Sequence, residues 1–381
     1  MTHVSHFVGL SGIGGVQRNF VEYINSQVVS GLDSGFSHKI YTLGVVDSQY
    51  KLLVDVHDIR EFKNLFSLMM DIVSKKKVVH FYNNLTSLKM AVLILFLPVS
   101  NLILHERGSI WNFPVVHGAL LRFVAWKARL ILANSNATKT MLEKKFHILN
   151  EKIRVLHNGI NTEIKYKKKP KYDYTHPFFV GFIGRLDTPK GVHVLIDAMR
   201  YLVEDNVKLI IAGDGVLENT LKQQSSDLDN ISFIGRVAEP YGFLSMLDLL
   251  VVPSIREPLG NVCLEAGLCK VPVLAANVDG LPEIISDKIS GELIYPTKEV
   301  SCKVVSGAVS LPEFVVNPVT QKLESPKQID PFLLSSKIIE LYNSPDILLG
   351  YGEQLHNRVV KYFNMERYTH DLHSIYFEAS R

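Results

Sequence analysis

The sequence predicts an α/β protein made of two doubly wound domains, each a parallel sheet covered by helices. The chain has 381 residues, too many for one ordinary core and enough for two domains of about 150–200 residues. Hydrophobic residues make up 47% and charged residues 21% of it, the proportions of a globular protein. Short β-rich runs alternate with segments of helical periodicity, a pattern typical of parallel sheets with helices between the strands.

In the first half, six β-rich runs mark the expected strands, which are Val4–Val8, His38–Thr42, Val78–Tyr82, Leu102–His105, Leu130–Ala133 and Ile153–Leu156. Helices fill the intervals, for example Gly15–Val29 and Asn136–Lys145. The most apolar run, Met90–Leu104, is 15 residues long and contains Pro98. It is too short and too broken to cross a bilayer, so we expect a buried helix end followed by a buried strand.

A polar, basic segment, KYKKKPKYDY at 165–174, separates the two halves. No core can bury it, so we expect a linker there and a first domain of residues 1–171. The second domain, residues 172–361, starts again with strands expected at Phe178–Ile183, Val207–Ala212, Ile231–Ile234, Leu249–Val252 and Val271–Ala275. Residues 297–330 have weak periodicity and several prolines, which predicts an irregular insertion. Helical periodicity returns from Ile329, and the last helix, about 362–381, is free to pack back on the first domain.

The formal net charge of +3 hides an asymmetry between the halves. Residues 1–171 hold 23 Lys+Arg and 11 Asp+Glu, a net charge of +12, whereas residues 172–381 have a net charge of −9. A basic first half suggests an anionic partner. Its lysines gather mainly in two tracts, Lys75–Lys77 and Lys165–Lys171, without interleaved aromatic residues, so we expect no nucleic-acid partner.

Cysteine content and the first residues bear on the compartment. The three cysteines cannot form a disulfide framework, and their spacing matches no zinc pattern. The start, MTHVSHFVGL, lacks a basic region followed by a long apolar stretch, so a signal peptide is not expected. A cytoplasmic protein with reduced thiols is the simplest interpretation.

The first loop of interest follows the first expected strand and contains Gly12, Gly14 and Gly15. Glycines there allow backbone N–H groups to approach a phosphate at the start of a helix. A dinucleotide-binding fingerprint does not fit, because its third glycine would fall at Gln17 and the next strand ends in Gly44 rather than an acid. A phosphate site and a plain tight turn remain equally open from this segment alone.

The second loop, Gly184 to Gly191, follows the first strand of the second half and precedes a helix. It places Arg185 and Lys190 five residues apart. Two cations and a helix N-terminus at this spacing favour binding of one diphosphate over a role as ordinary loop charges.

The third loop follows Leu249–Val252 and contains Glu257, with Glu265 eight residues later on the next helix. The N–H groups of Leu259, Gly260, Asn261 and Val262 would lie at the start of that helix, ready for an anion. Glu265 can accept hydrogen bonds from a vicinal diol such as ribose. In its apolar surroundings it otherwise needs an internal ion-pair partner.

In this order, the segments resemble the retaining glycosyltransferases of family 4, which have the GT-B fold of two Rossmann-like domains facing across a cleft. The motifs that carry the resemblance are GRLDTPKG at 184–191, LIIAGDG at 209–215, ISFIGRV at 231–237 and PSIREPLGNVCLEAG at 253–267. Weaker matches are GGVQR at 14–18, HERG at 105–108, ANS at 133–135 and HNG at 157–159. The resemblance extends over roughly residues 1–295, and the insertion has no counterpart in it.

The resemblance implies a role for each matched residue. Gly184, Arg185 and Lys190 would hold the donor diphosphate, and Gly14 and Gly15 would close on it from the other domain. Glu265 would bind the ribose, Glu257 and the N–H groups after it the transferred sugar, and His105 would steady the transition state. Cations and N–H dipoles suit a reaction whose demand is stabilisation of separating charge. No metal and no cofactor beyond the nucleotide sugar is expected.

The sequence departs from the family pattern near the donor sugar. Pro258 and Leu259 stand where an aromatic residue often precedes the glycine, Lys270 occupies a usual glycine, and Asp279 replaces the first glycine of a common pair. The identity of the sugar is therefore open.

The expected function is transfer of a sugar to a glycan or lipid-linked glycan, as in bacterial surface polysaccharide synthesis. The basic half would then face an anionic acceptor or an anionic membrane surface on the cytoplasmic side. Two alternatives remain: a nucleotide-sugar epimerase or hydrolase of the same fold, and a non-catalytic partner subunit that retains the fold. Intact Arg185, Lys190, Glu257 and Glu265 argue against the second.

Overall fold

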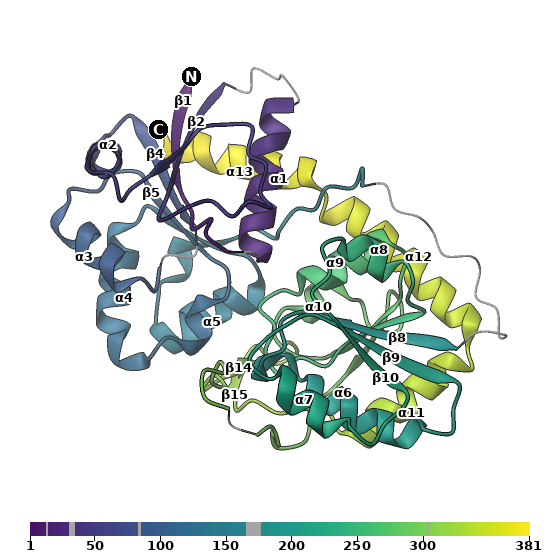
Figure 1. The fold of residues 1–381 in the computed structure, drawn as a ribbon. Coiled ribbons are helices and arrows are strands. Elements are labelled where there is room, and N and C mark those ends of the chain that lie inside the picture. The colour runs from purple at the N-terminus through teal and green to yellow at the C-terminus, as the bar shows by residue number, and fades with distance from the viewer. Residues whose placement is uncertain (13, 30–34, 83–84, 165–176, 304) are drawn as a thin grey trace. The chain divides into compact units, whose positions relative to one another are not determined.

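A computed structural model describes residues 1–381 except 13, 30–34, 83–84, 165–176 and 304. The chain divides into two compact units (Figure 1). The first comprises Met1–Asn161 and Phe363–Arg381, and the second Thr162–Tyr362. The boundary predicted at residue 171 and the predicted linker lie mostly outside the described residues.

The first unit is built on a seven-stranded parallel sheet with the order β3-β2-β1-β4-β5-β6-β7. Its strands are β1 (Thr2–Phe7), β2 (Phe36–Thr42), β3 (Val56–Asp58), β4 (Lys77–Tyr82), β5 (Leu102–Glu106), β6 (Leu130–Ala133) and β7 (Ile153–Val155). Its helices are α1 (Gly15–Val29), α2 (Phe62–Val73), α3 (Leu88–Phe96), α4 (Gly118–Lys127), α5 (Asn136–Phe146) and α13 (Met365–Ala379), with short 3-10 turns at Ser109–Asn112, Val115–His117 and Asn150–Lys152.

The direction of the crossovers decides which helices cover which face of this sheet. Strand order advances one way from β1 to β3 and the other way from β4 to β7, so right-handed crossovers put α1 and α2–α5 on opposite faces. The C-terminal α13 shares the α1 face, where Tyr368, Leu372 and Ile375 join Phe20 and Ile24 in one buried cluster. The chain end is therefore part of the first core.

The second unit has a six-stranded parallel sheet with the order β10-β9-β8-β11-β12-β13 and a separate two-stranded hairpin, β14-β15. Its strands are β8 (Phe178–Ile183), β9 (Val207–Ala212), β10 (Ile231–Gly235), β11 (Leu249–Val252), β12 (Val273–Ala276), β13 (Glu292–Ile294), β14 (Val315–Val316) and β15 (Leu323–Glu324). Its helices are α6 (Val192–Met199), α7 (Glu218–Gln224), α8 (Pro240–Leu244), α9 (Asn261–Leu268), α10 (Leu281–Ile284), α11 (Pro331–Tyr342) and α12 (Pro345–Tyr362), with 3-10 turns at Thr188–Lys190 and Arg200–Leu202.

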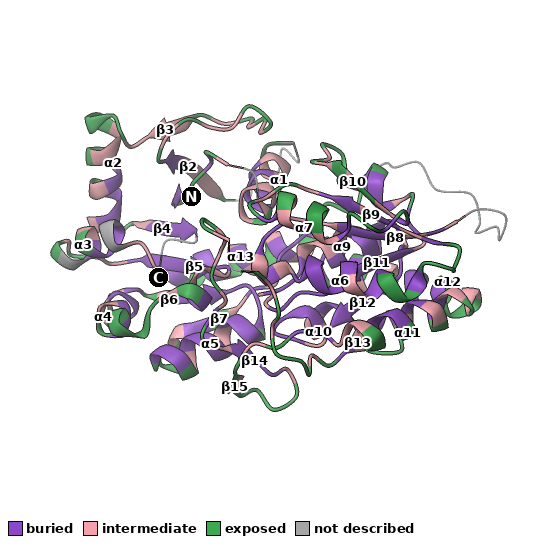
Figure 2. Cartoon of the chain, turned by 60° about the horizontal axis from the view of Figure 1, so that its bottom comes forward, coloured by how far each residue is buried: buried purple, intermediate pink, exposed green. Residues whose placement is uncertain are grey.

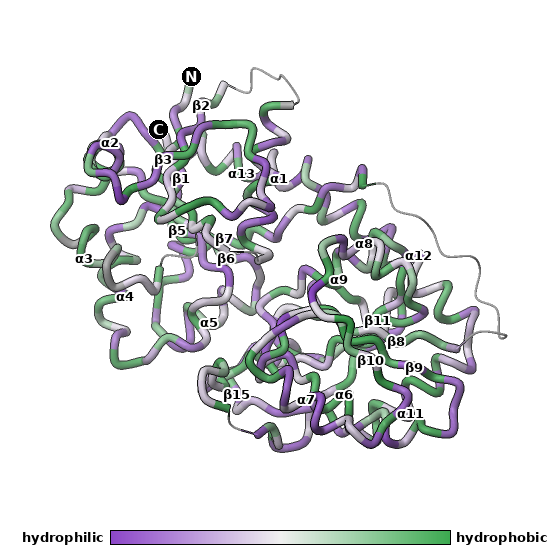
Figure 3. Tube along the Cα trace, viewed as in Figure 1, coloured by the Kyte–Doolittle hydropathy of each residue, from purple (hydrophilic) through white to green (hydrophobic). Residues whose placement is uncertain are grey.

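The central strands of this sheet are apolar along their whole length because helices cover both faces. All four residues of β11 and of β12 are buried, and the exposed residues lie mainly on the outer surfaces of the helices (Figure 2). The same division appears in hydropathy, with the central strands hydrophobic (Figure 3). This burial makes the sheet a rigid base for the loops at its edge.

The topology also determines where these loops meet. The strand order reverses between β8 and β11, and in doubly wound sheets the ligand site lies at the carboxyl ends of the strands at such a switch point. The loops after β8 and β11 are the two that hold Arg185, Lys190 and Glu257. In the first unit, the corresponding reversal lies between β1 and β4.

Two details differ from the prediction. The strand expected at Val271–Ala275 begins only at Val273, because Val271 and Pro272 still belong to the turn after α9. The short strands β3 and β13, three residues long each, were not predicted, since so brief a run has no periodicity to detect. The expected insertion is largely irregular, apart from the hairpin β14-β15, and the predicted C-terminal helical stretch is three helices, α11, α12 and α13.

Candidate functional site

The loops after β8 and β11 are bonded to each other through their backbones. The Pro189 carbonyl accepts hydrogen bonds from the N–H groups of Ile255, at 2.9 Å, and Arg256, at 3.2 Å. Gly191 closes the first loop with φ of +67°, and a Cβ there would lie 2.0 Å from the carbonyl oxygen of Pro253. Only glycine meets both conditions, so Gly191 is what allows the two loops to touch.

This contact brings together Lys190 and Glu257, which are 67 residues apart in the sequence. The Lys190 Nζ lies 2.5 Å from the Glu257 Oε2, and their side chains are 31% and 10% exposed. The Ser254 hydroxyl also donates to Oε2, at 3.3 Å. A largely buried carboxylate therefore holds a half-buried cation at the switch point of the sheet.

The segment around Arg185 rests on the neighbouring loop after β9. The Leu186 N–H donates to the Asp214 carbonyl at 2.8 Å, and the Gly184 N–H donates to the Ala212 carbonyl at 3.0 Å. A Cβ on Gly213 would lie 1.9 Å from the Gly184 carbonyl oxygen, so the loops pack backbone to backbone. The Arg185 side chain is exposed, whereas Leu186 is buried and anchors the loop.

The residues predicted to bind the sugar and ribose lie at and along α9. Gly260 caps the helix with φ of +101°, Leu259 before it is buried, and Asn261 and Val262 open the first turn. The N–H groups of a first helical turn have no partner within the helix and carry its positive dipole end. Glu265, on the second turn, is half-buried.

The Cys263 side chain on α9 is fully buried and lies near Glu257, Glu265 and Lys190. Burial raises its pKa, the nearby Glu257 and Glu265 carboxylates raise it further, and Lys190 opposes them. This thiol therefore stays protonated and acts as a small apolar side chain. The structure thus brings together Lys190, Glu257, Glu265 and the N-terminus of α9, a set that can bind a phosphate and a polyol. Arg185 lies exposed on the adjoining loop, and no contact joins it to these residues within the described part of the chain.

In the first unit, Gly14 and Gly15 lie at the start of α1. The Gly14 N–H donates to the Tyr50 hydroxyl at 3.3 Å, and its carbonyl accepts from the Arg18 N–H at 3.0 Å. Gly15 is the first residue of the helix and is exposed. Its N–H therefore lies at the positive end of α1.

A buried guanidinium supports this helix start. Arg107 is 7% exposed, and its Nη2 donates to Asn19 Oδ1 at 2.6 Å and to Asn158 Oδ1. Its Nη1 reaches the Val16 carbonyl at 3.5 Å. Arg107 thus joins the end of β5 to the first turn of α1 and to the segment after β7.

His105, beside Arg107 in the sequence, is wholly buried at the end of β5. Its ring stacks on that of His80, with centroids 5.3 Å apart. Among the residues that the structure describes, neither ring nitrogen has a hydrogen-bond partner. Burial, reinforced by the Arg107 charge, lowers the pKa of His105 well below its usual range, so the ring is neutral.

Comparison with protein families gives two matches that follow one another along the chain. Residues 53–164 match the family model described as Glycosyltransferase Family 4. Residues 164–304 match the one described as Glycosyl transferases group 1. The second match contains every site residue predicted in the second unit.

Curated relatives match part of this chain and part of their own length. An uncharacterised glycosyltransferase of Methanocaldococcus jannaschii is 34% identical over 50% of this chain and 56% of its own. The capsular polysaccharide biosynthesis glycosyltransferase CapM of Staphylococcus aureus is 28% identical over 43% of this chain and 47% of its own. The chain thus spans about half the length of the curated relatives that it matches.

Solved structures match over nearly the whole chain. Anabaena HepE, solved in complex with UDP and glucose, superposes with a TM-score of 0.77 at 17% identity over 99% of this chain and 100% of its own. The sucrose-phosphate synthase of Thermosynechococcus elongatus superposes with a TM-score of 0.72 at 15% identity over 99% of both chains. The chain is a GT-B protein that resembles glycosyltransferase family 4.

Two residues of this GT-B protein, Arg107 and Asp279, have roles in the structure that the sequence did not predict. Arg107 lies inside the HERG segment, but its burial and its contacts to Asn19 and Asn158 have no sequence signature. Asp279 was noticed as a departure from a glycine pair. The structure shows why glycine is common there, since Asp279 has φ of +48°, and it shows that the Asp279 carboxylate binds the backbone N–H of Glu257 at 2.9 Å.

Within the described part of this GT-B protein, no helix is long and apolar enough to cross a membrane. The Met90–Leu104 run falls in α3 and β5. The strand is buried as predicted, but the expected burial of the helix end is wrong, because Phe96, the last residue of α3, is 79% exposed. The charge asymmetry is smaller when counted by structural unit than by sequence half. The first unit holds 20 Lys+Arg and 13 Asp+Glu, a net charge of +7, because residues 165–171 lie outside it and α13 adds acids.

Proposed function

We propose that the protein is a retaining glycosyltransferase that moves a hexose from a nucleoside-diphosphate sugar to a hydroxyl group of a glycan or lipid-linked glycan. The observation that carries the proposal is the Lys190–Glu257 pair, at 2.5 Å, between the loops at the switch point. The Lys190 cation can bind a phosphate oxygen of a diphosphate, and the Glu257 carboxylate can accept a hydrogen bond from a sugar hydroxyl. Their adjacency suits a ligand that contains both groups.

In this mechanism, the protein stabilises charge as the bond between the sugar and the diphosphate breaks. Arg185, Lys190 and the first turn of α9 would bind the phosphate oxygens, where negative charge accumulates. Glu257 would accept hydrogen bonds from sugar hydroxyls, and Glu265 would hold the ribose. The acceptor hydroxyl would attack from the face that the diphosphate leaves, and a phosphate oxygen would take its proton. Because cations and N–H groups meet the charge demand, we propose that the reaction requires no metal.

We do not propose His105 as a general acid. Its ring is neutral and wholly buried, so it suits a packing role at the end of β5 or donation of one hydrogen bond better than general acid catalysis.

Several relatives act on bacterial glycans, which supports the choice of acceptor class. CapM of S. aureus is named for capsular polysaccharide biosynthesis. A Campylobacter jejuni relative, 29% identical over 50% of this chain and 53% of its own, is named as an N-acetylgalactosaminyltransferase acting on a diphospho-undecaprenol acceptor. We propose an acceptor of this kind, a growing surface glycan on a lipid carrier.

A lipid-linked acceptor requires access to a membrane surface, and the first unit has features that suit one. Large apolar side chains are exposed on consecutive helices, with Phe62 80%, Phe96 79% and Trp126 69% exposed on α2, α3 and α4. The helices α2, α3 and α4 lie in succession along one side of this unit (Figures 1 and 2). With the net charge of +7, they favour peripheral binding to an anionic membrane on the cytoplasmic side.

The deciding experiment is a binding and slow-hydrolysis screen of UDP-, GDP-, ADP- and dTDP-sugars against the matching free diphosphates. We expect at least one nucleotide sugar to bind more tightly than its free diphosphate. If none does, the transferase proposal is wrong. Conversion of the sugar to an epimer without acceptor would instead favour an epimerase.

A further inference from the structure

The described residues of the insertion, residues 297–330, are hydrogen-bonded at several points to the loops around the proposed donor site and to α6. The Val309 N–H donates to Asp187 Oδ1 at 2.8 Å. The Val316 N–H donates to Asp279 Oδ1 at 2.7 Å, and the Asp279 N–H returns a bond to the Val316 carbonyl at 3.0 Å.

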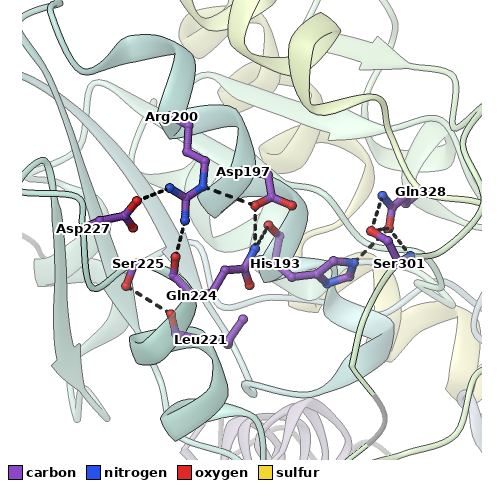
Figure 4. A network of polar contacts seen from close by, with 9 residues as sticks. All are labelled: His193, Asp197, Arg200, Leu221, Gln224, Ser225, Asp227, Ser301 and Gln328. Carbon is purple, nitrogen blue, oxygen red and sulfur yellow. Dashed lines mark hydrogen bonds and ion pairs between the residues drawn. The ribbon is translucent and has the colours of Figure 1, made fainter.

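Another point lies at the base of the insertion, where a polar network joins it to α6 (Figure 4). Gln328 Oε1 lies 2.9 Å from His193 Nε2 and accepts a bond from the Ser301 N–H at 3.0 Å. His193 is the second residue of α6, the helix that begins directly after Gly191. The base of the insertion is therefore bonded to a residue that lies three positions after Lys190 in the sequence.

Of these connections, the one through Asp279 leads directly to the proposed sugar-binding carboxylate. Asp279 is 2% exposed, and its Oδ2 accepts a bond from the Glu257 N–H at 2.9 Å. The Gly280 N–H donates to the Glu257 carbonyl at 3.1 Å. Both backbone groups of Glu257 are thus held by the turn at residues 279–280.

One carboxylate oxygen of Asp279 therefore accepts a hydrogen bond from the insertion, and the other accepts one from the proposed site. Its two oxygens connect Val316 in β14 to Glu257, and Glu257 in turn contacts Lys190 at 2.5 Å. A carboxylate accepting backbone N–H groups makes charge-assisted bonds, which are stronger than those of a neutral acceptor. The connection is also short, because only one side chain separates the hairpin from the loop.

We propose that Asp279 is a positioning residue that couples the insertion hairpin to Glu257 and so sets recognition of the sugar part of the nucleotide sugar. This inference rests on the proposed function, because it takes Glu257 as a sugar ligand. Of the proposed diphosphate contacts, those of Arg185 and the α9 N-terminus do not pass through Asp279, and that of Lys190 does so only indirectly, through Glu257. Loss of Asp279 should therefore weaken binding of the nucleotide sugar more than binding of its free diphosphate.

Two substitutions separate the backbone role of Asp279 from its carboxylate role. Both Asn and Gly adopt the left-handed conformation readily, so neither strains the turn. Asp279→Asn retains one acceptor oxygen, whereas Asp279→Gly removes both. The matched control is Asp287→Asn, because the exposed Asp287 also accepts a backbone bond, from the Leu293 N–H at 2.8 Å, without contacting a site residue.

The test measures Kd for UDP-glucose and UDP, or for the matching ADP or GDP pair that the screen selects, by calorimetry on the full chain. We expect Asp279→Asn to weaken nucleotide-sugar binding by about 10-fold and diphosphate binding by less than about 3-fold. Asp279→Gly should enlarge that difference, and Asp287→Asn should leave both constants unchanged. Equal weakening of both ligands in the Asp279 variants would overturn the inference.

Amide hydrogen exchange gives a readout that does not depend on ligand. If Asp279 couples the hairpin to the loop, peptides containing Glu257 and Val316 should both exchange faster in Asp279→Asn than in the natural protein. Acceleration at neither peptide, or equally in Asp287→Asn, would overturn the coupling. If the natural protein binds no nucleotide sugar while exchange changes as expected, the proposed function fails and the coupling stands.

Discussion

The Nζ of Lys190 lies 2.5 Å from Oε2 of Glu257, although each residue is expected to contact a different part of one ligand. In the ligand-free protein the two charges neutralise each other. A bound diphosphate would compete with Glu257 for Lys190. On the proposed function, the pair would oppose diphosphate binding and hold both side chains in place until the nucleotide sugar binds.

The first prediction concerns loss of the Glu257 carboxylate, which would compete with a diphosphate for Lys190. In Glu257→Gln, Lys190 loses its carboxylate partner, and we expect the affinity for free UDP or the matching diphosphate to rise by about 5-fold, the value of a partly exposed ion pair. Sugar transfer should fall by about 100-fold or more, because a carboxylate contact to the sugar is lost. Calorimetry and a radiolabelled transfer assay measure the two effects.

The control for this variant is Glu218→Gln, which breaks the exposed Lys222–Glu218 pair in the same unit. It should change neither quantity. Weaker diphosphate binding in Glu257→Gln would contradict a competition between the carboxylate and the phosphate for Lys190.

Loss of Lys190 itself should abolish turnover while the protein stays folded. We expect Lys190→Ala to lower kcat/KM by about 10³-fold, since a cation at the leaving group contributes most in the transition state. The half-buried pair stabilises the fold by about 1 kcal/mol at most, so the urea midpoint should move little. Lys222→Ala is the matched control, and activity of Lys190→Ala near that of the control would remove Lys190 from the phosphate site.

Arg107 is expected to stabilise the first unit and the start of α1. Replacing it by Met leaves Asn19 and Asn158 without their buried donor, and we expect the free energy of unfolding to fall by about 3 kcal/mol. Urea titration followed by circular dichroism gives the value. Arg122→Met, at an exposed position of α4, should cost less than about 0.5 kcal/mol; similar losses in the two variants would show that the Arg107 contacts contribute little.

A cluster of histidines in the first core predicts a pH-dependent stability. Burial lowers the pKa of His6, His80 and His105 well below the usual range, and lowers that of His38 and His373 to about 4. Neighbouring histidine charges add to the effect for His6, His38 and His80. All five are therefore neutral in the folded protein.

The direction of the effect follows from proton binding. Below about pH 6.5 the unfolded chain protonates these histidines and the folded chain does not, so stability is complete above that pH and falls as the pH drops. Each histidine contributes about 1.4 kcal/mol per pH unit once the unfolded chain is mostly protonated. Urea titrations at pH 5, 6, 7 and 8 should give a plateau above pH 7 and a slope of about four protons below pH 6.

His373→Asn should reduce that slope by about one proton, whereas His370→Asn should not, because the side chain of His370 is 85% exposed. A slope independent of pH, or equal changes in the two variants, would mean that the core histidines do not titrate on unfolding.

Features of the fold and the site that depend on neighbouring residues can be predicted from the sequence, whereas contacts between residues far apart in the sequence cannot. The glycines, the strand–loop–helix order and residues such as Lys190 and Glu257 belong to local motifs, and their placement at the carboxyl ends of parallel strands follows from topology. The contact between them depends on Gly191 lying against Pro253, a packing detail across 62 residues of sequence. No local pattern specifies such a contact.

The roles of Asp279 and Arg107 were beyond prediction for the same reason. Asp279 needs a partner in the insertion, at Val316, and the insertion has no periodicity from which to place it. Arg and His are residue types that often lie exposed in loops, yet Arg107 is only 7% exposed and His105 0%. Burial of polar side chains at the end of a strand depends on what covers that end, here the first turn of α1 and the segment after β7.

The exposed aromatic residues of α3 and α4 lead to the last prediction, on membrane binding. Phe96 and Trp126 lie near the ends of helices that Lys127 joins, since its Nζ donates to the Ile94 and Leu97 carbonyls at 2.8 Å each. Substituting both aromatics by Ser should reduce sedimentation with vesicles containing anionic lipid by about 10-fold or more, because insertion of their rings would be lost. Phe332→Ser, which removes a side chain 61% exposed on α11 of the second unit, should not. If the natural protein binds neutral and anionic vesicles equally weakly, the membrane partner is excluded. If it binds anionic vesicles and 1 M salt abolishes that binding, the basic charge of the first unit contributes to membrane binding.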